Sequence, residues 1–332
     1  MAQALSLRVG DLVEVLGEEE ILATLDERGE LDGLPFMPEM LQFCGKRMVV
    51  KKVAHKLCDT MTQSGMRRMD DAVYLEGARC DGSAHGGCQT YCSIYWKTAW
   101  LKKVSGAADA SAAGPGASRG VLLPLLQKNS FKEPGPEGEV RYLCQATELL
   151  RAAPVCLSFR DPRQYVTDVR TGNATVWETL RTIVFGLFDR YQSFSRRRLP
   201  RWLWIRGGLT WGWVGPGPNR TTPSGTLDLQ PGELVRIKSK ADIIATLGAD
   251  RKNRGLGFEE EMAHWCGRTA RVQARVERCL DEKTGRMLQM KNPCILLEDV
   301  VCKGLYKTNC PREFAPFWRE IWLERLSEPE MT

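Results

Sequence analysis

Residues 7–45 read "LRVGDLVEVLGEEEILATLDERGELDGLPFMPEMLQFCG", and residues 229–267 read "LQPGELVRIKSKADIIATLGADRKNRGLGFEEEMAHWCG". The offset of 222 residues that separates Leu7 from Leu229 aligns the two stretches without a gap, and it still superposes Trp100 on Trp322. A single offset held over so long a stretch is typical of a tandem duplication, in which one structural unit is used twice. The sequence therefore predicts two homologous units.

Each unit begins with the alternation of apolar and polar residues that favours a β-strand, at residues 10–15 and 232–237. A short amphipathic helix follows, then further strands and a closing aromatic segment. The opening resembles the SH3/KOW-type barrels of translation and transcription proteins, and this resemblance implies a fold but no activity. We therefore expect a mainly β chain, with two homologous SH3-like small barrels from an internal duplication and a helical central insert.

The composition along the chain predicts four regions. Residues 1–104 form the first repeat with its Cys/His cluster, and residues 105–138 form a flexible linker and connector that begins with "SGAADASAAGPGASRG". Residues 139–227 form a helical central segment that becomes rich in tryptophan and arginine. Residues 228–327 form the second repeat.

The chain also resembles a family of uncharacterised bacterial proteins. The resemblance is carried by "RCDGSAHGGCQTYC" at residues 79–92 with "YWKTAWL", by "CQATEL", "DPRQY" and "DVRTGN" in the centre, and by "NPCILLEDVVC" with "FWREIWLERL" near the end. It spans most of the length and therefore supports the expected architecture. It implies no activity that can be carried over to this chain.

Composition constrains the partners only weakly. The 47 Lys and Arg residues against 41 Asp and Glu give a net charge of +6, which is compatible with an anionic partner but does not require one. The chain has no long apolar run and no secretory layout at its start, so we expect a cytoplasmic protein with no membrane partner. In that reducing setting, metal binding or burial explains twelve cysteines better than disulfides do.

The cysteines and histidines of the first repeat predict a metal centre. Three cysteines lie in register in both copies, but only the first copy has His55, Cys58, His85 and Cys92 at the aligned positions. Zinc and iron need about four such donors around one point. The loop that carries His85 is bracketed by glycines, which let the backbone wrap closely around an ion. We therefore expect a zinc or iron ion with ligands from the set Cys44, His55, Cys58, Cys80, His85, Cys88 and Cys92.

Two alternatives stay open for these side chains. Cysteine packs well as a small buried apolar residue, so the matched Cys266, Cys302 and Cys310 are either core residues or the remains of a second metal site. His55 and His85 are also compatible with ordinary hydrogen-bonded histidines. The additional ligands in one copy favour chemistry there, because both copies would need a purely structural ion equally.

Two carboxylates and one basic segment are further candidates. Glu76 and Glu298 occupy matched positions in apolar strands, where a carboxylate is costly unless it is paired. Either each of these carboxylates forms an ion pair with a strand arginine such as Arg47 or Arg275, or Glu76 is a metal ligand or an acid/base group. The segment "RRRLPRWLWIRGGLTWGW" combines arginine and tryptophan, which suits phosphate contacts and base stacking. Its candidate substrate-binding residues are Arg196, Arg198, Arg201, Arg206, Trp202 and Trp204.

The leading hypothesis is a metal-dependent enzyme that acts on a small anionic substrate, with one zinc or iron centre in the first repeat. His85 and Glu76 are its candidate catalytic residues, and the arginines of the basic segment would hold the substrate. The alternative is a zinc-stapled barrel module that binds RNA or a protein partner through the basic tryptophan segment, with nucleic acid the less favoured partner. The sequence does not decide the metal, the substrate, the reaction or the oligomeric state.

Overall fold

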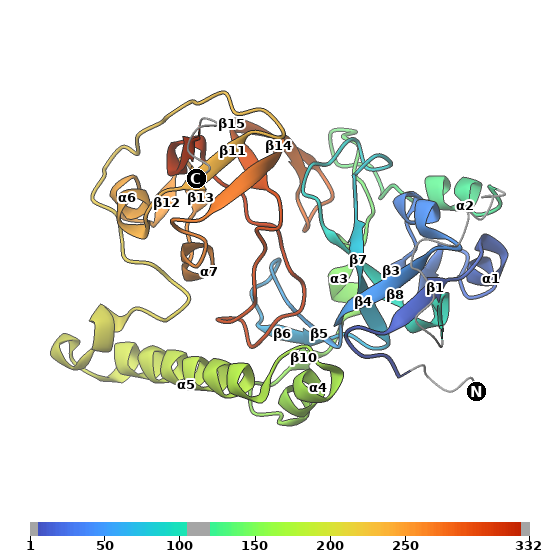
Figure 1. The fold of residues 1–332 in the computed structure, drawn as a ribbon, viewed down its shortest axis with the longest axis horizontal. Coiled ribbons are helices and arrows are strands. Elements are labelled where there is room, and N and C mark those ends of the chain that lie inside the picture. The colour runs from blue at the N-terminus through green and yellow to red at the C-terminus, as the bar shows by residue number, and fades with distance from the viewer. Residues whose placement is uncertain (1–5, 105–119, 327–332) are drawn as a thin grey trace. The chain divides into compact units, whose positions relative to one another are not determined.

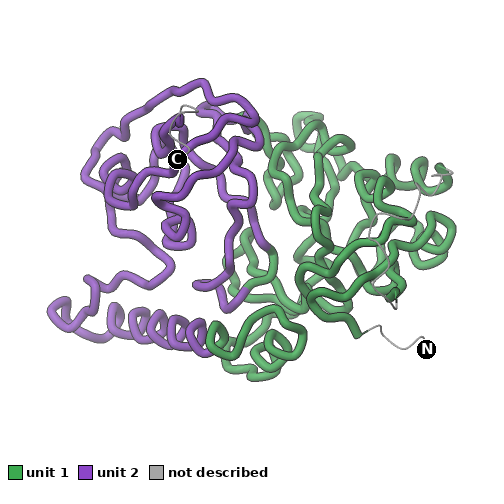
Figure 2. Tube along the Cα trace, in the orientation of Figure 1, with its two compact units in different colours: residues 1–179, 278–289, 310–312 green, residues 180–277, 290–309, 313–332 purple. Residues whose placement is uncertain are grey.

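The computed structural model describes residues 6–104 and 120–326. Within these residues the chain forms two compact units, which Figure 2 colours separately. Residues 1–179 form most of unit 1, and its remaining parts are residues 278–289 and 310–312. All other residues belong to unit 2. The predicted flexible linker falls mainly on residues 105–119, which lie outside the described residues.

Unit 1 is built on an antiparallel five-stranded sheet with the strand order β8-β7-β4-β1-β9 (Figure 1). Its strands are β1 (Leu12–Val15), β4 (Arg47–Val53), β7 (Ala72–Arg79), β8 (Ser93–Lys97) and β9 (Leu101–Lys103). A second sheet contains β5 (Lys56–Cys58), β6 (Met66–Arg68) and β10 (Cys156–Leu157), and a small hairpin joins β2 (Glu30–Leu31) to β3 (Leu34–Pro35). The helices are α1 (Glu18–Leu22), η1 (Pro38–Phe43), η2 (Thr98–Trp100), α2 (Leu123–Lys128), α3 (Leu149–Ala152) and α4 (Arg163–Thr171).

Unit 2 contains an antiparallel four-stranded sheet with the order β15-β14-β11-β16. Its strands are β11 (Leu234–Ile237), β14 (Thr269–Leu280), β15 (Met287–Leu297) and β16 (Leu323–Arg325), and a small hairpin joins β12 (Lys252–Asn253) to β13 (Leu256–Gly257). Its short helices are η3 (Arg201–Leu203), η4 (Ile205–Gly208), α6 (Lys240–Ala245), α7 (Glu260–Ala263) and η5 (Glu320–Trp322). The two half-barrel sheets confirm the expectation of a mainly β chain with a minor helical part.

The long helix α5 (Val176–Arg198) forms the centre of the predicted helical segment. The division between the units falls inside it, after residue 179, so the predicted segment 139–227 contributes to both units. Among the described residues, no helix has both the length and the apolar character needed to cross a bilayer.

The two main sheets have the same strand register. In unit 1, Leu12 of β1 pairs with Val49 of β4. In unit 2, Leu234 of β11 pairs with Arg271 of β14, so both numbers are higher by the offset of 222 found in the sequence. The pairings of β1 with β9 and of β11 with β16 are related by the same offset. The backbone of the two sheets is therefore paired equivalently.

Each unit has a core with two fully buried tryptophans. In unit 1, the indole Nε1 of Trp100 donates to Thr24 Oγ1 at 3.0 Å, and in unit 2 Trp322 donates to Thr246 Oγ1 at 2.8 Å. A buried indole N–H without an acceptor is costly, so each threonine makes burial of the large ring favourable. The four tryptophans are Trp96, Trp100, Trp318 and Trp322.

The turn between β5 and β6 is organised by one buried carboxylate. Asp59 Oδ1 accepts the backbone N–H groups of Met61 and Thr62, and Oδ2 accepts Ser64 Oγ at 2.6 Å and Arg67 Nε at 3.0 Å. Burial alone would raise the pKa of Asp59. The hydrogen bonds from Ser64 and Thr62 and the guanidinium of Arg67 outweigh it and hold this pKa well below its usual range.

Replacing Asp59 with alanine is expected to lower the free energy of unfolding at neutral pH by about 2 kcal/mol, because the donors of this turn lose their shared acceptor. A depressed carboxyl pKa contributes stability above the usual aspartate pKa, and this contribution is lost as the pH falls through the folded-state value. The difference between the wild type and Asp59→Ala should therefore shrink in acid, as measured by urea denaturation. The control is Asp281→Ala at the matched position, where the carboxylate accepts from Lys283 and Thr284. An equal difference at neutral and acid pH would contradict this account.

Candidate metal centre

The side chains of Glu39, Cys80 and His85 meet in unit 1. Glu39 lies in the first turn of η1, Cys80 directly follows β7, and His85 lies in the loop after it. One ligand atom from each of the three residues lies within 4.8 Å of the others, and this is the one such group of three or more His, Cys, Asp or Glu residues among those the structure describes. Carboxylate, thiolate and imidazole together are a donor set typical of zinc.

The glycines of the loop bring His85 inward. Gly82 has a positive φ of 71°, and a Cβ at this position would overlap the backbone carbonyl of Cys88. Its carbonyl accepts the N–H groups of His85 and Gly87, both at 3.0 Å, which closes a tight turn. The backbone N–H of Cys80 donates to the carbonyl of Cys92 at 2.9 Å and closes the base of the loop. A residue with a side chain at position 82 would therefore open the turn that places the imidazole.

Both nitrogens of His85 face oxygen acceptors. The ring is 1% exposed, and its Nε2 lies 2.9 Å from the backbone carbonyl of Leu143. A carbonyl only accepts, so Nε2 must carry a proton and donate it. On the other side, Nδ1 lies 2.6 Å from Oε1 of Glu39. Two lone pairs at this distance repel each other, so either they share a proton or the two atoms move apart to admit a metal ion.

Glu39 has one oxygen left over. Its side chain is 4% exposed, and its Oε1 also accepts the backbone N–H of Ala84 at 3.0 Å. Its Oε2 is buried and has no hydrogen-bond partner among the described residues. A buried carboxylate oxygen without a partner is costly, so this atom is suited to a cation ligand.

Cys80 completes the group. Burial raises the pKa of its thiol well above the usual value, and the carboxylate of Glu39 raises it further. Cys92 and Cys144 are also near enough to raise it. The thiol is therefore protonated at neutral pH unless a metal ion displaces the proton.

A loop of the same design lies 222 residues further along, in unit 2. Glu261 is the counterpart of Glu39, and it accepts the backbone N–H of Tyr306 at 2.9 Å, as Glu39 accepts that of Ala84. Part of the role of Glu39 is therefore to hold the loop, and this role needs no ion. Sequence reasoning missed Glu39, and the acidic residue kept at this aligned position was the signal that could have found it.

The second loop differs where the first has its imidazole. Cys302 begins the loop as Cys80 begins the first, but Lys307 stands at the position of His85. A protonated lysine offers no lone pair to a metal ion. The second loop thus lacks the imidazole that His85 provides in the first.

Two of the other predicted ligands lie apart from this group. Cys44 is buried in the core of unit 1, where burial and then the nearby Glu18 raise the pKa of its thiol to about 12. His55 Nε2 contacts Oδ1 of Asp168 at 2.8 Å, so this histidine has a carboxylate partner of its own.

The remaining three predicted cysteines, Cys58, Cys88 and Cys92, are outside the group of Glu39, Cys80 and His85. Cys88 Sγ lies 3.2 Å from Thr90 Oγ1 and accepts the backbone N–H of Leu280 at 3.4 Å. The backbone N–H of Cys58 donates to Cys310 Sγ at 3.2 Å. Position 88 thus contacts position 280, and position 58 contacts position 310. The offset of 222 relates 58 to 280 and 88 to 310, so the two contacts join the same pair of aligned positions. Burial also raises the pKa of Cys92 above its usual value.

Neither candidate strand carboxylate lies in an apolar interior. Glu76 and Glu298 are both exposed, so the predicted burial cost does not arise. The predicted arginine partners pair elsewhere, Arg47 with Glu14 at 3.3 Å and Arg275 with Glu320 at 2.7 Å. Each glutamate follows four consecutive buried residues, 72–75 and 294–297, and stands where the burial of the segment ends.

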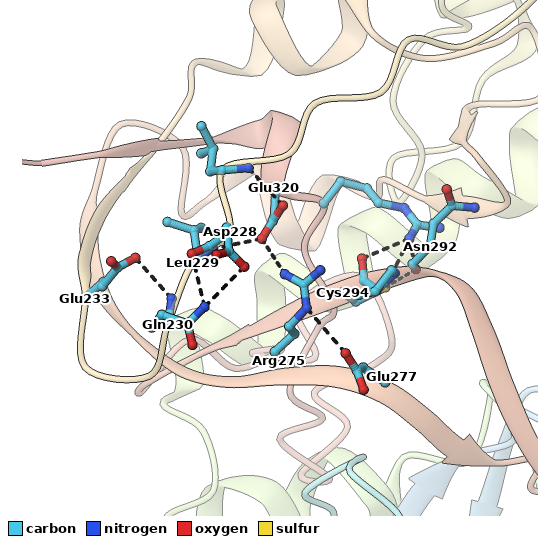
Figure 3. Close-up of polar contacts among 12 residues, drawn as sticks. Asp228, Leu229, Gln230, Glu233, Arg275, Glu277, Asn292, Cys294 and Glu320 are labelled. Carbon is cyan, nitrogen blue, oxygen red and sulfur yellow. Dashed lines mark hydrogen bonds and ion pairs between the residues drawn. The ribbon is translucent and has the colours of Figure 1, made fainter.

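Figure 3 shows the group around Arg275 in unit 2. Glu320 Oε1 accepts from the guanidinium and from the backbone N–H of Leu229, and Oε2 accepts the N–H of Leu227. Burial opposes ionisation of Glu320, but the two backbone N–H groups and Arg275 lower its pKa. Glu277 lies on the other side of the guanidinium, 3.5 Å away. These contacts attach residues 227–229 to the sheet and give no sign of a reacting group.

The basic tryptophan segment is divided between two cavities of unit 2. One cavity of about 480 Å³ is lined in part by Arg196, Arg201 and Trp204. Arg198 lines a different cavity of about 560 Å³. Trp202 is exposed, and the guanidinium of Arg206 lies 4.7 Å above the ring of Trp211. The structure thus brings together three of the six predicted substrate-binding residues.

Comparison with known proteins adds no family and no relative. No family model, no curated protein and no solved structure matches this chain.

Proposed function

We propose that this chain is a zinc-binding protein in which Glu39, Cys80 and His85 of the first repeat hold one ion. The observation that carries the proposal is the convergence of one ligand atom from each side chain within 4.8 Å, with Glu39 Oε2 buried and unpartnered while His85 Nε2 donates to Leu143. A metal-binding histidine usually donates its second ring N–H to a backbone carbonyl or carboxylate, which leaves the other nitrogen free for the metal. His85 has this arrangement, with its free nitrogen towards a carboxylate and a thiol.

The donor set favours zinc over iron. One thiolate, one imidazole and one carboxylate are borderline ligands that zinc accepts in tetrahedral sites. Non-haem Fe(II) centres prefer two histidines with one carboxylate, and iron–sulfur clusters require several cysteines. Three protein ligands leave one tetrahedral position for a water molecule or a nearby thiol such as Cys92 or Cys144.

The burial of the group favours a structural ion over the enzyme that the sequence suggested. His85 and Glu39 are 1% and 4% exposed, so a substrate would have to displace packed side chains to reach the ion. An ion at this point joins η1, the end of β7 and the loop that follows, three segments without a continuous sheet between them. We infer that it staples this loop to the barrel.

We also infer that the two half-barrels are SH3-like and arose by duplication of one unit. The equal strand registers and the matched Trp–Thr hydrogen bonds support this inference. After duplication, one copy would have kept or gained the imidazole and the other would carry Lys307. The ion would then belong to the first copy only.

The metal content of the purified full chain tests the proposal. We expect one zinc per chain by elemental analysis, after loading with zinc and dialysis. His85→Lys should abolish it, and circular dichroism checks that this variant is folded, because His85 is buried whereas Lys307 at the matched position is exposed. Cys156→Ser, which removes an exposed thiol of unit 1, is the matched control and should retain the ion.

The competing explanation is an imidazolium paired with the Glu39 carboxylate, with a proton in place of the metal ion. It predicts a folded wild type without zinc after dialysis. That result, or full zinc content in folded His85→Lys, would overturn the proposed site.

A further inference from the structure

The long helix α5 has its polar side towards the protein. Four of its polar residues, Thr179, Thr182, Gln192 and Ser195, are buried. Thr182 Oγ1 donates to the carbonyl of Leu305 at 2.8 Å, and Gln192 Nε2 donates to the carbonyl of Leu209 at 3.0 Å. These bonds attach the helix through side chains to backbone carbonyls, beside the rings of Phe185 and Phe188, which both pack on Trp211.

The opposite side of α5 is apolar and exposed. Its large side chains are spaced alternately by three and four residues, so they lie along one face of the helix. We call this face the α5 seam, and it consists of Trp177, Leu180, Val184, Leu187, Tyr191 and Phe194. All six are exposed, with Trp177 at 74%.

An exposed apolar face of this length is unusual for a protein surface in water. Single exposed apolar residues are common, but contiguous patches mark sites that another surface covers. Trp202, 80% exposed in η3, adds a second tryptophan shortly after the end of α5. Tryptophan and tyrosine are the side chains most enriched at the boundary between water and lipid.

The surroundings of the α5 seam are strongly cationic. Residues 176–206 contain seven arginines and two acidic residues. Asp189 accepts the backbone N–H of Trp211, and Glu178 accepts the N–H and hydroxyl of Thr175, so both carboxylates have partners within the chain. A cavity of about 560 Å³ at the carboxyl end of the helix is lined by Arg190, Ser193, Phe194, Arg197 and Arg198.

We propose that α5 lies on an anionic lipid surface, with the α5 seam among the acyl chains and the arginines at the headgroup phosphates. A basic amphipathic helix with tryptophan, leucine and phenylalanine on its apolar face binds membranes in this way. The proposal departs from the expectation of no membrane partner, which rested on the lack of a long apolar run, because a helix lying in the surface needs no span. The proposal is independent of the zinc site.

Two other partners fit the observations less well. A nucleic acid would gain from arginine and aromatic stacking, but Leu180, Val184 and Leu187 in the middle of the seam offer it nothing. A second copy of the chain packed in parallel along the seam would bring the two clusters of Arg196, Arg197 and Arg198 together, which costs free energy.

Flotation of the full chain with vesicles tests the proposal. We expect it to float with vesicles of phosphatidylcholine and phosphatidylglycerol in equal amounts, and not with phosphatidylcholine alone. The double variant Leu180→Glu and Leu187→Glu should reduce the bound fraction by about tenfold or more, since it places two carboxylates in the apolar face. Arg197→Gln should weaken partition by about fivefold, the usual effect of one cation near an anionic surface.

The matched control carries the same chemical change at exposed apolar positions of unit 1, Val140→Glu with Leu288→Glu. It should float like the wild type. Failure of the wild type to bind anionic vesicles, or equal flotation of the seam variant, would overturn the proposal. The proposal would also be overturned if the wild type did not bind lipid but formed a dimer in sedimentation, or bound single-stranded RNA, and the seam variant abolished that dimer or that binding.

Discussion

Replacing Asp168 with alanine is expected to lower the free energy of unfolding of unit 1 by about 3–5 kcal/mol. Asp168 on α4 is fully buried and accepts from Lys56 Nζ at 2.6 Å and contacts His55 Nε2 at 2.8 Å. Lys56 is itself fully buried, so the variant leaves an ammonium group in the interior without its partner. Circular dichroism during urea denaturation measures the loss.

The pH dependence of the stability of Asp168→Ala shows whether the unpaired Lys56 ammonium causes the loss. Burial lowers the pKa of Lys56, and the Asp168 carboxylate works against this in the wild type. Without the carboxylate the pKa falls further, and the unfolded chain then binds more protons than the folded chain up to a pH of about 10. The stability of Asp168→Ala should therefore rise with pH over that range.

The double variant Asp168→Ala with Lys56→Met is the control. A buried ion pair replaced by apolar side chains of similar volume is often close to neutral in stability. We expect the double variant to be more stable than Asp168→Ala alone. Equal loss in both variants would show that the cost comes from a cavity at α4 and not from the unpaired ammonium.

The sequence predicted the parts of this fold that repeat a local pattern. The strands that become β1 and β11 alternate apolar and polar residues, and both are found where that pattern lies. The single offset of 222 also anticipated equal strand registers, because side chains that pack in the same order impose the same pairing. Local alternation and self-similarity carry this information directly.

The site depended on contacts that no local pattern encodes. Glu39 lies 46 residues from His85 and looks like the polar face of a short helix, and only the fold buries it beside the imidazole. His55 was assigned to the same ion, but its partner Asp168 lies 113 residues away on a helix of the central segment. Residue type predicted a His/Cys site, and the long-range packing decided which members of the set meet.

The orientation of α5 shows a further limit of sequence patterns. Its apolar residues recur at helical spacing, which ordinarily predicts the buried face. The structure buries the opposite face, where Thr182 and Gln192 bond to backbone carbonyls and Phe185 packs on Trp211. Periodicity gives the helix and its two faces, but not which face the protein covers.

Removing zinc with a chelator is expected to lower the free energy of unfolding of the wild type by about 4 kcal/mol, relative to protein in free zinc at roughly a thousand times its dissociation constant. An ion that binds only the folded chain stabilises it by mass action, and here the unfolded chain separates Glu39 from Cys80 by forty-one residues. The loop after Cys80 should lose order first, since the proposed ion adds to the hydrogen bond from Ala84 to Glu39 that already ties the loop to η1.

The same titration with His85→Lys decides between an ion and a shared proton at Glu39. This variant should show no response to zinc or to chelator, while Cys156→Ser should respond like the wild type. A proton between Nδ1 and Oε1 would make the wild type insensitive to chelator as well, and would leave Glu39 and His85 as a buried ion pair that holds the loop. A wild-type response that persists unchanged in His85→Lys would place the ion on other ligands, because the variant removes the imidazole that the proposed site requires.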